Sequence, residues 1–253
     1  MVPHGLVRGQ VVERIDWTEQ EFSLKVHAPV MPYRAGQFTK LALQNDDGEW
    51  IRRAYSIVNH PAHKRGYQEM EFLIISHPGG ALSPLLHKLN VADDIYVGKE
   101  PAGFMTLDEI PDYAEDLWML SSGTAIGPFL SMLGEPDLSF RTMVLVHAVR
   151  TEAELVYRQQ IKHLQQHYAG RLKYVPIVSS EKVKGVLSGR IPALIQSGKL
   201  EQHAEIKLIQ RSSFAYLCGN PSMVRDTSEK LKSFGLNKHL RRKQGQFSSE
   251  NYW

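Results

Sequence analysis

The sequence predicts a two-domain protein, with an antiparallel six-stranded β-barrel over residues 1–104 and an α/β domain over residues 105–253. In the first part, six short strand-like runs are separated by tight turns, which is typical of a small antiparallel barrel. In the second part, apolar strand-like runs alternate with helical patterns, which indicates a doubly wound parallel sheet. The 253 residues suit two domains of ordinary size, or one large one.

The expected barrel strands are bounded by proline, glycine and aspartate turns. The run Phe22–Val26 alternates between apolar and polar residues, as a half-buried strand does. The expected strands are Val7–Ile15, Phe22–His27, Gln37–Leu43, Arg53–Asn59, Glu69–Ser76 and Asp94–Glu100.

The second part begins with Leu117–Leu120, a short and continuously apolar strand that leads into a turn and an apolar helix through Leu133. Further strands are expected at Met143–Val149, Leu172–Val178 and Phe214–Cys218, with helices at Glu152–Tyr168 and near Ile191–Ser197. A last helix is expected after an Asn220 cap, with Pro221 in its first turn, an end at Gly235 and a stripe of Met223, Val224, Leu231 and Phe234. The loops after Leu120, Val149, Val178 and Cys218 should share one rim of the sheet, where ligands bind in such folds.

Composition excludes several classes of protein. With 42% hydrophobic and 23% charged residues the chain is globular. No apolar run approaches the roughly 20 residues that span a bilayer, and the start lacks the layout of a signal peptide. One cysteine, Cys218, excludes an intrachain disulfide and fits a reducing compartment, so a cytoplasmic protein without membrane association is expected.

The net charge of +3 is too small to imply nucleic acid by itself. The positive charge gathers late in the chain, which is usual for a solvated face but also suits an acidic partner. This basic cluster comprises Arg225, Lys230, Lys232, Lys238, Arg241, Arg242 and Lys243.

The stretch Arg53-Ala54-Tyr55-Ser56 combines a guanidinium, an aromatic ring and a hydroxyl in an extended run. Such a set suits a flavin nucleotide, since arginine bonds phosphate, tyrosine stacks on a planar ring and serine donates or accepts. Tyr55 and Ser56 point to opposite faces of a strand, so using both requires a bulge, a strand end or a backbone contact. The alternative is an ordinary barrel strand with a paired arginine and a core tyrosine.

The turn Gly79-Gly80 precedes a short helix for which Ser83 is expected as the cap and Pro84 as the first residue. A glycine-rich turn at a helix N-terminus is a ready site for an anion, although a plain capped helix has the same pattern.

In the second part, Ser121–Pro128 is rich in glycine and hydroxyls and opens a helix, while Arg150 follows its strand directly. Both features favour a nucleotide site. Cys218 by itself reads as a small buried hydrophobe. His163 and His167 have a metal-compatible spacing, but without an adjacent carboxylate motif they read as surface histidines, and no metal is expected.

Motifs spread over the whole chain together resemble the bacterial ferredoxin (flavodoxin)–NADP⁺ reductases, members of the plant-type reductase family. They are Ala35–Lys40, Arg53–Ser56, Leu82–Pro84, Ser122–Pro128, His147–Arg150, Ser188–Pro192, Cys218–Pro221, Met223–Asp226 and Tyr252-Trp253. The resemblance implies an FAD-binding barrel, an NADP-binding domain, and hydride transfer between nicotinamide and flavin coupled to electron exchange with an acidic ferredoxin or flavodoxin.

The resemblance also implies roles for individual residues. Arg53 would face the FAD pyrophosphate, Tyr55 would stack on the isoalloxazine, and Ser56 would lie near its reactive nitrogen. Further FAD contacts would come from Ala54, Leu73, Ile74, Ile75, Ser76, Gly80, Ala81, Leu82, Ser83, Thr124, Tyr252 and Trp253. NADP contacts would come from Thr124, Val149, Arg150, Ser179, Ser180, Arg190, Cys218, Gly219 and Asp226. Ser56 and Cys218 would position the reacting rings and would not act as nucleophiles.

One position departs from the family pattern. Ser179-Ser180 stands where the bacterial family commonly has Ser-Arg, and that arginine helps bind the 2′-phosphate of NADP. A charge-assisted hydrogen bond contributes ~1.5–3 kcal/mol, so a narrower preference for NADPH over NADH is expected. Lys182 or Lys184 could supply part of the missing charge.

Three alternatives are an NAD(P)H:flavin reductase, the reductase component of an oxygenase, and a nucleic-acid-binding protein that uses Arg241–Lys243. The last would bind no flavin, and nucleic acid is not expected as a partner. A monomer is expected.

Overall fold

The computed structural model describes residues 2–240 and 242–252. They form two compact units, residues 2–107 with Gly127–Pro136, and Asp108–Ile126 with residues 137–240 and 242–252. The chain therefore passes between the units at three places along its length. The boundary between cofactor-binding domains after residue 104 stays a prediction.

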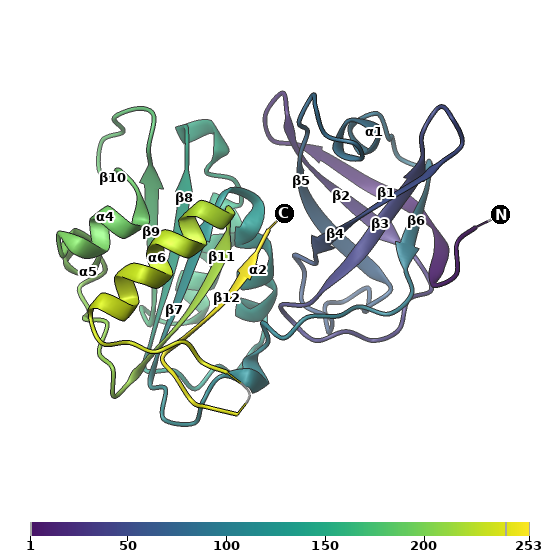
Figure 1. Ribbon diagram of the computed structural model, residues 1–253. Helices are drawn as coiled ribbons and strands as arrows, with labels where there is room; N and C mark the ends of the chain where they lie inside the picture. The colour runs from purple at the N-terminus through teal and green to yellow at the C-terminus, as the bar shows by residue number, and fades with distance from the viewer. Residues whose placement is uncertain (1, 241, 253) are drawn as a thin grey trace. The chain divides into compact units, whose positions relative to one another are not determined.

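The first unit contains one antiparallel sheet of six strands in the order β4-β3-β6-β1-β2-β5 (Figure 1). The predicted barrel class is confirmed. The strands are β1 (Leu6–Asp16), β2 (Glu21–His27), β3 (Phe38–Gln44), β4 (Trp50–Ser56), β5 (Glu69–Ile75) and β6 (Asp94–Gly98). Beyond β4, the N–H of Val58 donates to the carbonyl of Glu71 (2.8 Å), so the chain joins the two edge strands of the sheet.

The inward faces of these strands form one apolar core that includes Phe22, Leu24 and Val26 from β2. The short helix α1 (Ser83–His87) packs on this core through Leu86 and the preceding Leu82 (Figure 1). The core thus fixes α1 and the loop that leads into it.

The helix α2 (Gly127–Leu133) belongs to the first unit although it follows the first strand of the second unit in sequence. All seven of its residues are buried. The hydroxyl of Ser131 donates to the carbonyl of Asn59 (2.9 Å), and a side chain at Gly134 would meet the Cβ of His60 at 2.6 Å. Glycine at position 134 therefore permits close packing against the barrel.

The second unit contains a parallel sheet of six strands in the order β10-β9-β8-β7-β11-β12. The predicted doubly wound class is confirmed. The strands are β7 (Asp116–Ser122), β8 (Thr142–Val149), β9 (Leu172–Val178), β10 (Leu187–Ser188), β11 (Ser213–Gly219) and β12 (Phe247–Asn251). The helices are α3 (Arg158–His167), α4 (Ile191–Gln196), α5 (Lys199–Ala204) and α6 (Pro221–Ser233), with 3₁₀ turns η1 (Leu107–Glu109), η2 (Gly123–Ile126) and η3 (Glu152–Glu154).

Several predicted details are wrong. The helix expected from Glu152 begins at Arg158, because Tyr157 has a left-handed backbone (φ 59°) that separates η3 from α3. Phe234 is 51% exposed, so it is not part of the buried stripe of α6. The strand expected at Arg53–Asn59 is shifted to Trp50–Ser56 because the chain changes partner strands after Ser56.

The cap of α6 is as predicted: the side chain of Asn220 accepts hydrogen bonds from the N–H groups of Ser222 (2.9 Å) and Met223 (3.4 Å). Gly235 follows the helix with a left-handed φ of 82°, as its predicted end requires. No helix in the described part of the chain is long and apolar enough to cross a membrane.

Candidate cofactor sites

Arg53 and Tyr55 lie on β4 and point to the same side of the strand. Tyr55 is half-buried and packs against the barrel core, whereas Arg53 is exposed and donates one hydrogen bond to the carbonyl of Arg52 (2.8 Å). Burial raises the pKa of the Tyr55 phenol to about 12, with a smaller opposing effect from the charge of Arg53. The phenol is therefore neutral, and the guanidinium keeps most of its donors for another acceptor.

Ser56 is the last residue of β4 and is 4% exposed. The next N–H, of Ile57, still donates to Gln37 beside β3 (3.0 Å), whereas that of Val58 donates to Glu71 in β5 (2.8 Å). The strand end required for Tyr55 and Ser56 to serve one ligand is thus present. Whether both contact a flavin stays a prediction.

The loop between β5 and α1 offers unpaired backbone donors. Among the described residues, no protein group accepts a hydrogen bond from the N–H of Ala81, Leu82 or Ser83. Three adjacent free N–H groups are what an anion needs from a backbone cradle. Leu73–Ile75 in β5 and Ser76 lead directly into this loop.

Ser83 does not cap α1, which corrects the prediction from sequence. It is the first helical residue, and Leu82 occupies the cap position without a side-chain bond. The Ser83 hydroxyl instead accepts from the N–H of His77 (3.1 Å), which closes the loop. A Cβ at Gly80 would lie 2.7 Å from this oxygen, so a larger residue there would displace the Ser83 hydroxyl.

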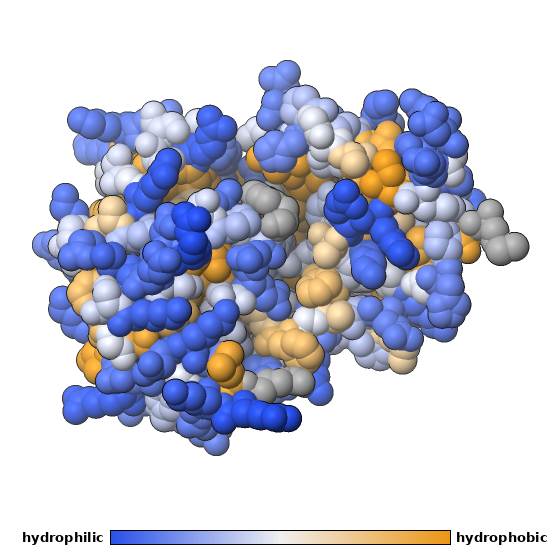
Figure 2. Space-filling view, viewed as in Figure 1, coloured by the Kyte–Doolittle hydropathy of each residue, from blue (hydrophilic) through white to orange (hydrophobic). Residues whose placement is uncertain are grey.

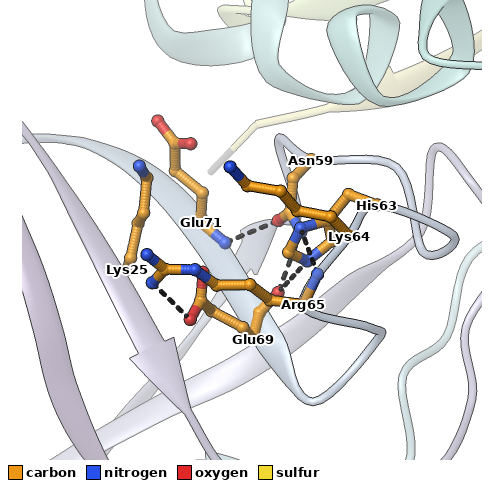
Figure 3. Close-up of a pocket in the computed structure, with 7 residues that line it drawn as sticks. All are labelled: Lys25, Asn59, His63, Lys64, Arg65, Glu69 and Glu71. Carbon is orange, nitrogen blue, oxygen red and sulfur yellow. Dashed lines mark hydrogen bonds and ion pairs between the residues drawn. The ribbon is translucent and has the colours of Figure 1, made fainter.

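A hollow of about 240 Å³ lies on the outer face of β2 and β5 (Figure 3). Its charges are largely paired: Arg65 bonds Glu69 (3.0 Å), and Lys25 bonds Glu13 (2.8 Å). The side chain of Asn59 donates to the carbonyl of Glu69 (2.8 Å) and accepts from the N–H of Glu71 (2.6 Å). No residue of Arg53–Ser56 lines the hollow, so the hollow is not the candidate flavin site. Its hydrogen bonds at Asn59 instead hold the chain that follows Ser56.

In the second unit, the predicted rim is confirmed. The parallel register sets Ser122 beside Ala148, Val149 beside Val178, and Cys218 beside Ser121. The loops after β7, β8, β9 and β11 therefore leave the sheet at one edge. Thr124 in η2 is 5% exposed, and Arg150, Ser179 and Ser180 are exposed.

Gly219 joins two of these loops. Its φ is 145°, and a Cβ there would lie 2.1 Å from the hydroxyl oxygen of Ser122. That hydroxyl accepts from the N–H of Asn220 (3.1 Å), and the carbonyl of Gly219 accepts from the N–H of Tyr252 (2.9 Å). Only glycine allows the β11 loop to approach the β7 loop this closely.

Cys218 is fully buried on β11, as its simplest interpretation expected. Burial raises the pKa of its thiol, and Glu250 on the neighbouring β12 raises it further. The thiol is therefore neutral and a poor nucleophile.

Arg150 and Arg190 are the exposed arginines proposed for this rim. The backbone of Arg150 is held on both sides, since its N–H donates to Glu154 (3.0 Å) and its carbonyl accepts from the N–H of Ser180 (2.9 Å). Within the described chain no acceptor lies on the guanidinium of either arginine. Both are free to bind an anion.

Asp226 lies on α6 and accepts from the side chain of Arg225 (2.9 Å). Tyr252 is within the described residues, but the predicted FAD contact of Trp253 lies outside them, as does Arg241 of the basic cluster. The face that carries α6 is largely hydrophilic (Figure 2), and Arg225, Lys232 and Lys238 are exposed.

Sequence reasoning assigned no role to His147, which is fully buried on β8. Burial lowers the pKa of its imidazole to about 4, although the nearby backbone of Gly123 partly favours the proton. Nδ1 lies 3.4 Å from the hydroxyl of Tyr174, and Nε2 makes no hydrogen bond. The sequence signal that could have singled out His147 is its position as a polar residue within the apolar run Met143–Val149.

Each half of the chain matches the model of a known domain family. Residues 9–105 match the oxidoreductase FAD-binding domain, and residues 119–229 match the oxidoreductase NAD-binding domain. The fold and the two sites thus define a flavin- and nicotinamide-dependent oxidoreductase.

Relatives identify the particular family. The flavodoxin/ferredoxin–NADP reductases of Shigella flexneri and Escherichia coli K12 are 48% and 47% identical over 250 residues, covering 98% of each chain. A ferredoxin NADP⁺ reductase from Neisseria gonorrhoeae, solved with FAD and NADP, has a TM-score of 0.90 at 30% identity and covers 99% of this chain and 100% of its own. This chain belongs to the flavodoxin/ferredoxin–NADP reductase family, and its cofactors are FAD and NADP(H).

Proposed function

We propose that this enzyme transfers electrons between NADPH and a small one-electron carrier, ferredoxin or flavodoxin. The observation that carries the proposal is 47–48% identity over nearly the whole length to enzymes named for that reaction. The two candidate sites support it, because each unit offers groups suited to one cofactor.

In the first unit, Arg53 and the free N–H groups of Ala81–Ser83 fit the pyrophosphate of FAD. Tyr55 would stack on the isoalloxazine ring, and Ser56 would orient its reactive edge with Ala54 and Leu73–Ser76 beside it. Bound FAD supplies the exchange between two-electron and one-electron chemistry. The neutral phenol of Tyr55 adds no charge to that process.

In the second unit, Arg150 and Arg190 would bind the 2′-phosphate of NADP, with Val149, Ser179 and Ser180 beside it. Thr124, Cys218 and Gly219 would line the nicotinamide end, and Asp226 would lie on the nucleotide side of α6. The neutral thiol of Cys218 packs and orients, and it does not attack. Tyr252 is assigned to FAD through the resemblance alone.

The carrier is proposed to be acidic and to meet the basic cluster of the second unit. Exposed charges at Arg225, Lys232, Lys238, Arg242 and Lys243 suit long-range attraction, which salt weakens. A monomeric, cytoplasmic enzyme is proposed on the single buried thiol and the absence of any sequence feature for assembly.

The deciding experiment is steady-state reduction of ferredoxin, flavodoxin and free flavin by NADPH and by NADH. The proposal expects the highest kcat/KM with NADPH and a protein carrier. Faster reduction of free flavin than of either carrier would instead identify a flavin reductase. Raising the salt concentration should increase the KM for the carrier, and a carrier KM that does not depend on salt would exclude the basic cluster.

A further inference from the structure

Arg14 points into the barrel because β1 contains a bulge. The pairing of β1 with β2 shifts between Val11 and Glu13. One extra residue exchanges the two faces of a strand, so residues after the bulge that would have faced outward face inward. Val11 lies in the core before the bulge, and Arg14 after it pairs with Leu24, which is also in the core.

The guanidinium of Arg14 holds the C-terminal end of α1. Its Nη1 donates to the carbonyls of His87 and Leu89, both at 2.8 Å, while Nε and Nη2 donate to Asp16 (3.0 and 2.7 Å). The side chain is 15% exposed and lies 4.6 Å from the centroid of the Phe22 ring. These bonds use four of the five N–H donors of Arg14. The bonds to Asp16 hold the pKa of its carboxyl below the usual value.

The other end of α1 carries the candidate phosphate loop. A helix of five residues has no stability of its own, so its position depends on its attachments. Leu82 and Leu86 attach it to the barrel core, and Arg14 attaches the carbonyl of its last residue, His87, to β1. The orientation of the free N–H groups of Ala81–Ser83 therefore depends on Arg14 at the far end of the helix as well as on the barrel core beneath the helix.

We infer that Arg14 is a positioning residue for FAD, which fixes α1 so that the loop Gly80–Ser83 presents its N–H groups to the phosphate. This inference rests on the proposed assignment of that loop to FAD. Arg14 itself is given no part in phosphate binding, because four of its five N–H donors bond protein acceptors and two of these bonds lie at the other end of α1.

The test compares FAD affinity in four variants, measured from the fluorescence of FAD released on dilution of the holoenzyme. Arg14→Met should raise the Kd for FAD about tenfold, since the charged hydrogen bonds to the last residue of α1 and to Leu89 just after it are lost. Arg14→Lys should recover part of the affinity, because an ammonium can still donate to the carbonyls. Arg8→Met is the matched control, as it removes an exposed ion pair with Asp94 (2.5 Å) from the same strand and should leave the Kd unchanged.

Ala81→Asp tests the loop separately, because Ala81 is exposed and a carboxylate there would repel a phosphate. If Ala81→Asp weakens FAD binding and Arg14→Met does not, the inference about Arg14 is overturned and the loop assignment stands. If Ala81→Asp has no effect, the loop assignment fails and the inference fails with it.

Two further measurements separate positioning from general destabilisation. Hydrogen exchange at the amides of Leu85–Leu89 should be faster in Arg14→Met than in Arg8→Met. The KM for NADPH at saturating FAD should be the same in both. A lowered unfolding midpoint with an unchanged Kd for FAD would refute the positioning role.

Discussion

Ser180→Arg should widen the preference for NADPH over NADH. Ser180 is exposed, and among the described residues its one hydrogen bond runs from its N–H to the carbonyl of Arg150 (2.9 Å). A new side chain leaves that bond intact and adds a guanidinium to a rim that already holds Arg150. The substitution therefore adds a phosphate donor without removing a structural contact.

The magnitude follows from the kind of bond and its exposure. One charge-assisted hydrogen bond contributes ~1.5–3 kcal/mol, and solvent screening at an exposed site reduces this to about 1–2 kcal/mol. The ratio of kcat/KM for NADPH to that for NADH should rise about 5- to 30-fold. Most of the change should come from a lower KM for NADPH, because the adenosine end is remote from the reacting atoms.

The assay is steady-state kinetics with both nicotinamides at fixed low salt. Gln202→Arg is the matched control, because it adds the same charge at an exposed position of α5. Glu205, the residue after this helix, bonds Lys173 near the start of β9 (3.3 Å). That is the edge of the sheet opposite the rim, so the control should leave the ratio unchanged. An equal ratio in Ser180→Arg and the wild type would show that this rim does not bind the 2′-phosphate.

Three further outcomes are expected. Ser56→Ala should slow flavin reduction by NADPH about tenfold to a hundredfold while FAD stays bound, and stopped-flow reduction at the wild-type rate would refute an orienting role. Gly219→Ala should lower kcat/KM for NADPH at least about tenfold, because its Cβ would collide with Ser122 Oγ at 2.1 Å; a variant with wild-type kinetics would show that the rim tolerates the displacement. The pKa of His147 is about 4 in the folded protein against an ordinary value of 6.5. The stability that the neutral imidazole contributes is therefore fully present above pH 6.5 and is lost as the pH falls towards 4. Between pH 7.5 and 5 the free energy of unfolding should fall by about 2 kcal/mol through this group. Urea titrations should show a flatter pH dependence in His147→Gln, and identical slopes would place the acid sensitivity elsewhere.

The sequence predicted the architecture well because the strands of each unit share one pattern of apolar residues. Alternation in Phe22–Val26 and continuous apolar runs such as Leu117–Leu120 reflect how strands are buried, and burial determines both sheets. The Asn220 cap was also predictable, since cap, proline and stop lie within one local segment.

What failed depends on partners distant in sequence. The bulge in β1 adds no unusual residue, so nothing local indicated that Arg14 points inward. The role of Ser83 depends on His77 across a loop, and the start of α3 depends on a left-handed Tyr157 that composition does not reveal. The edge strand β12 was missed because Phe247–Asn251 is mostly polar and only half-buried.

Apart from such details, the candidate site residues came from the resemblance more than from residue chemistry. Arg53, Tyr55 and the glycine turn could be argued physically, and the structure gives them an exposed cation, a half-buried ring and free amides. Val149, Ser179 and Asp226 had no such argument. Their assignment to NADP rests on the resemblance alone.

The membership of α2 in the barrel unit has a consequence for how the protein is made. Ser131 within the helix and Gly134 just after it contact segments synthesised earlier, at Asn59 and His60. During synthesis the barrel is complete when α2 emerges, so α2 has a surface to dock on before the parallel sheet exists. A fragment that begins after residue 104 would lack Asn59 and His60, so the amides of α2 should exchange with solvent faster in that fragment than in the full chain.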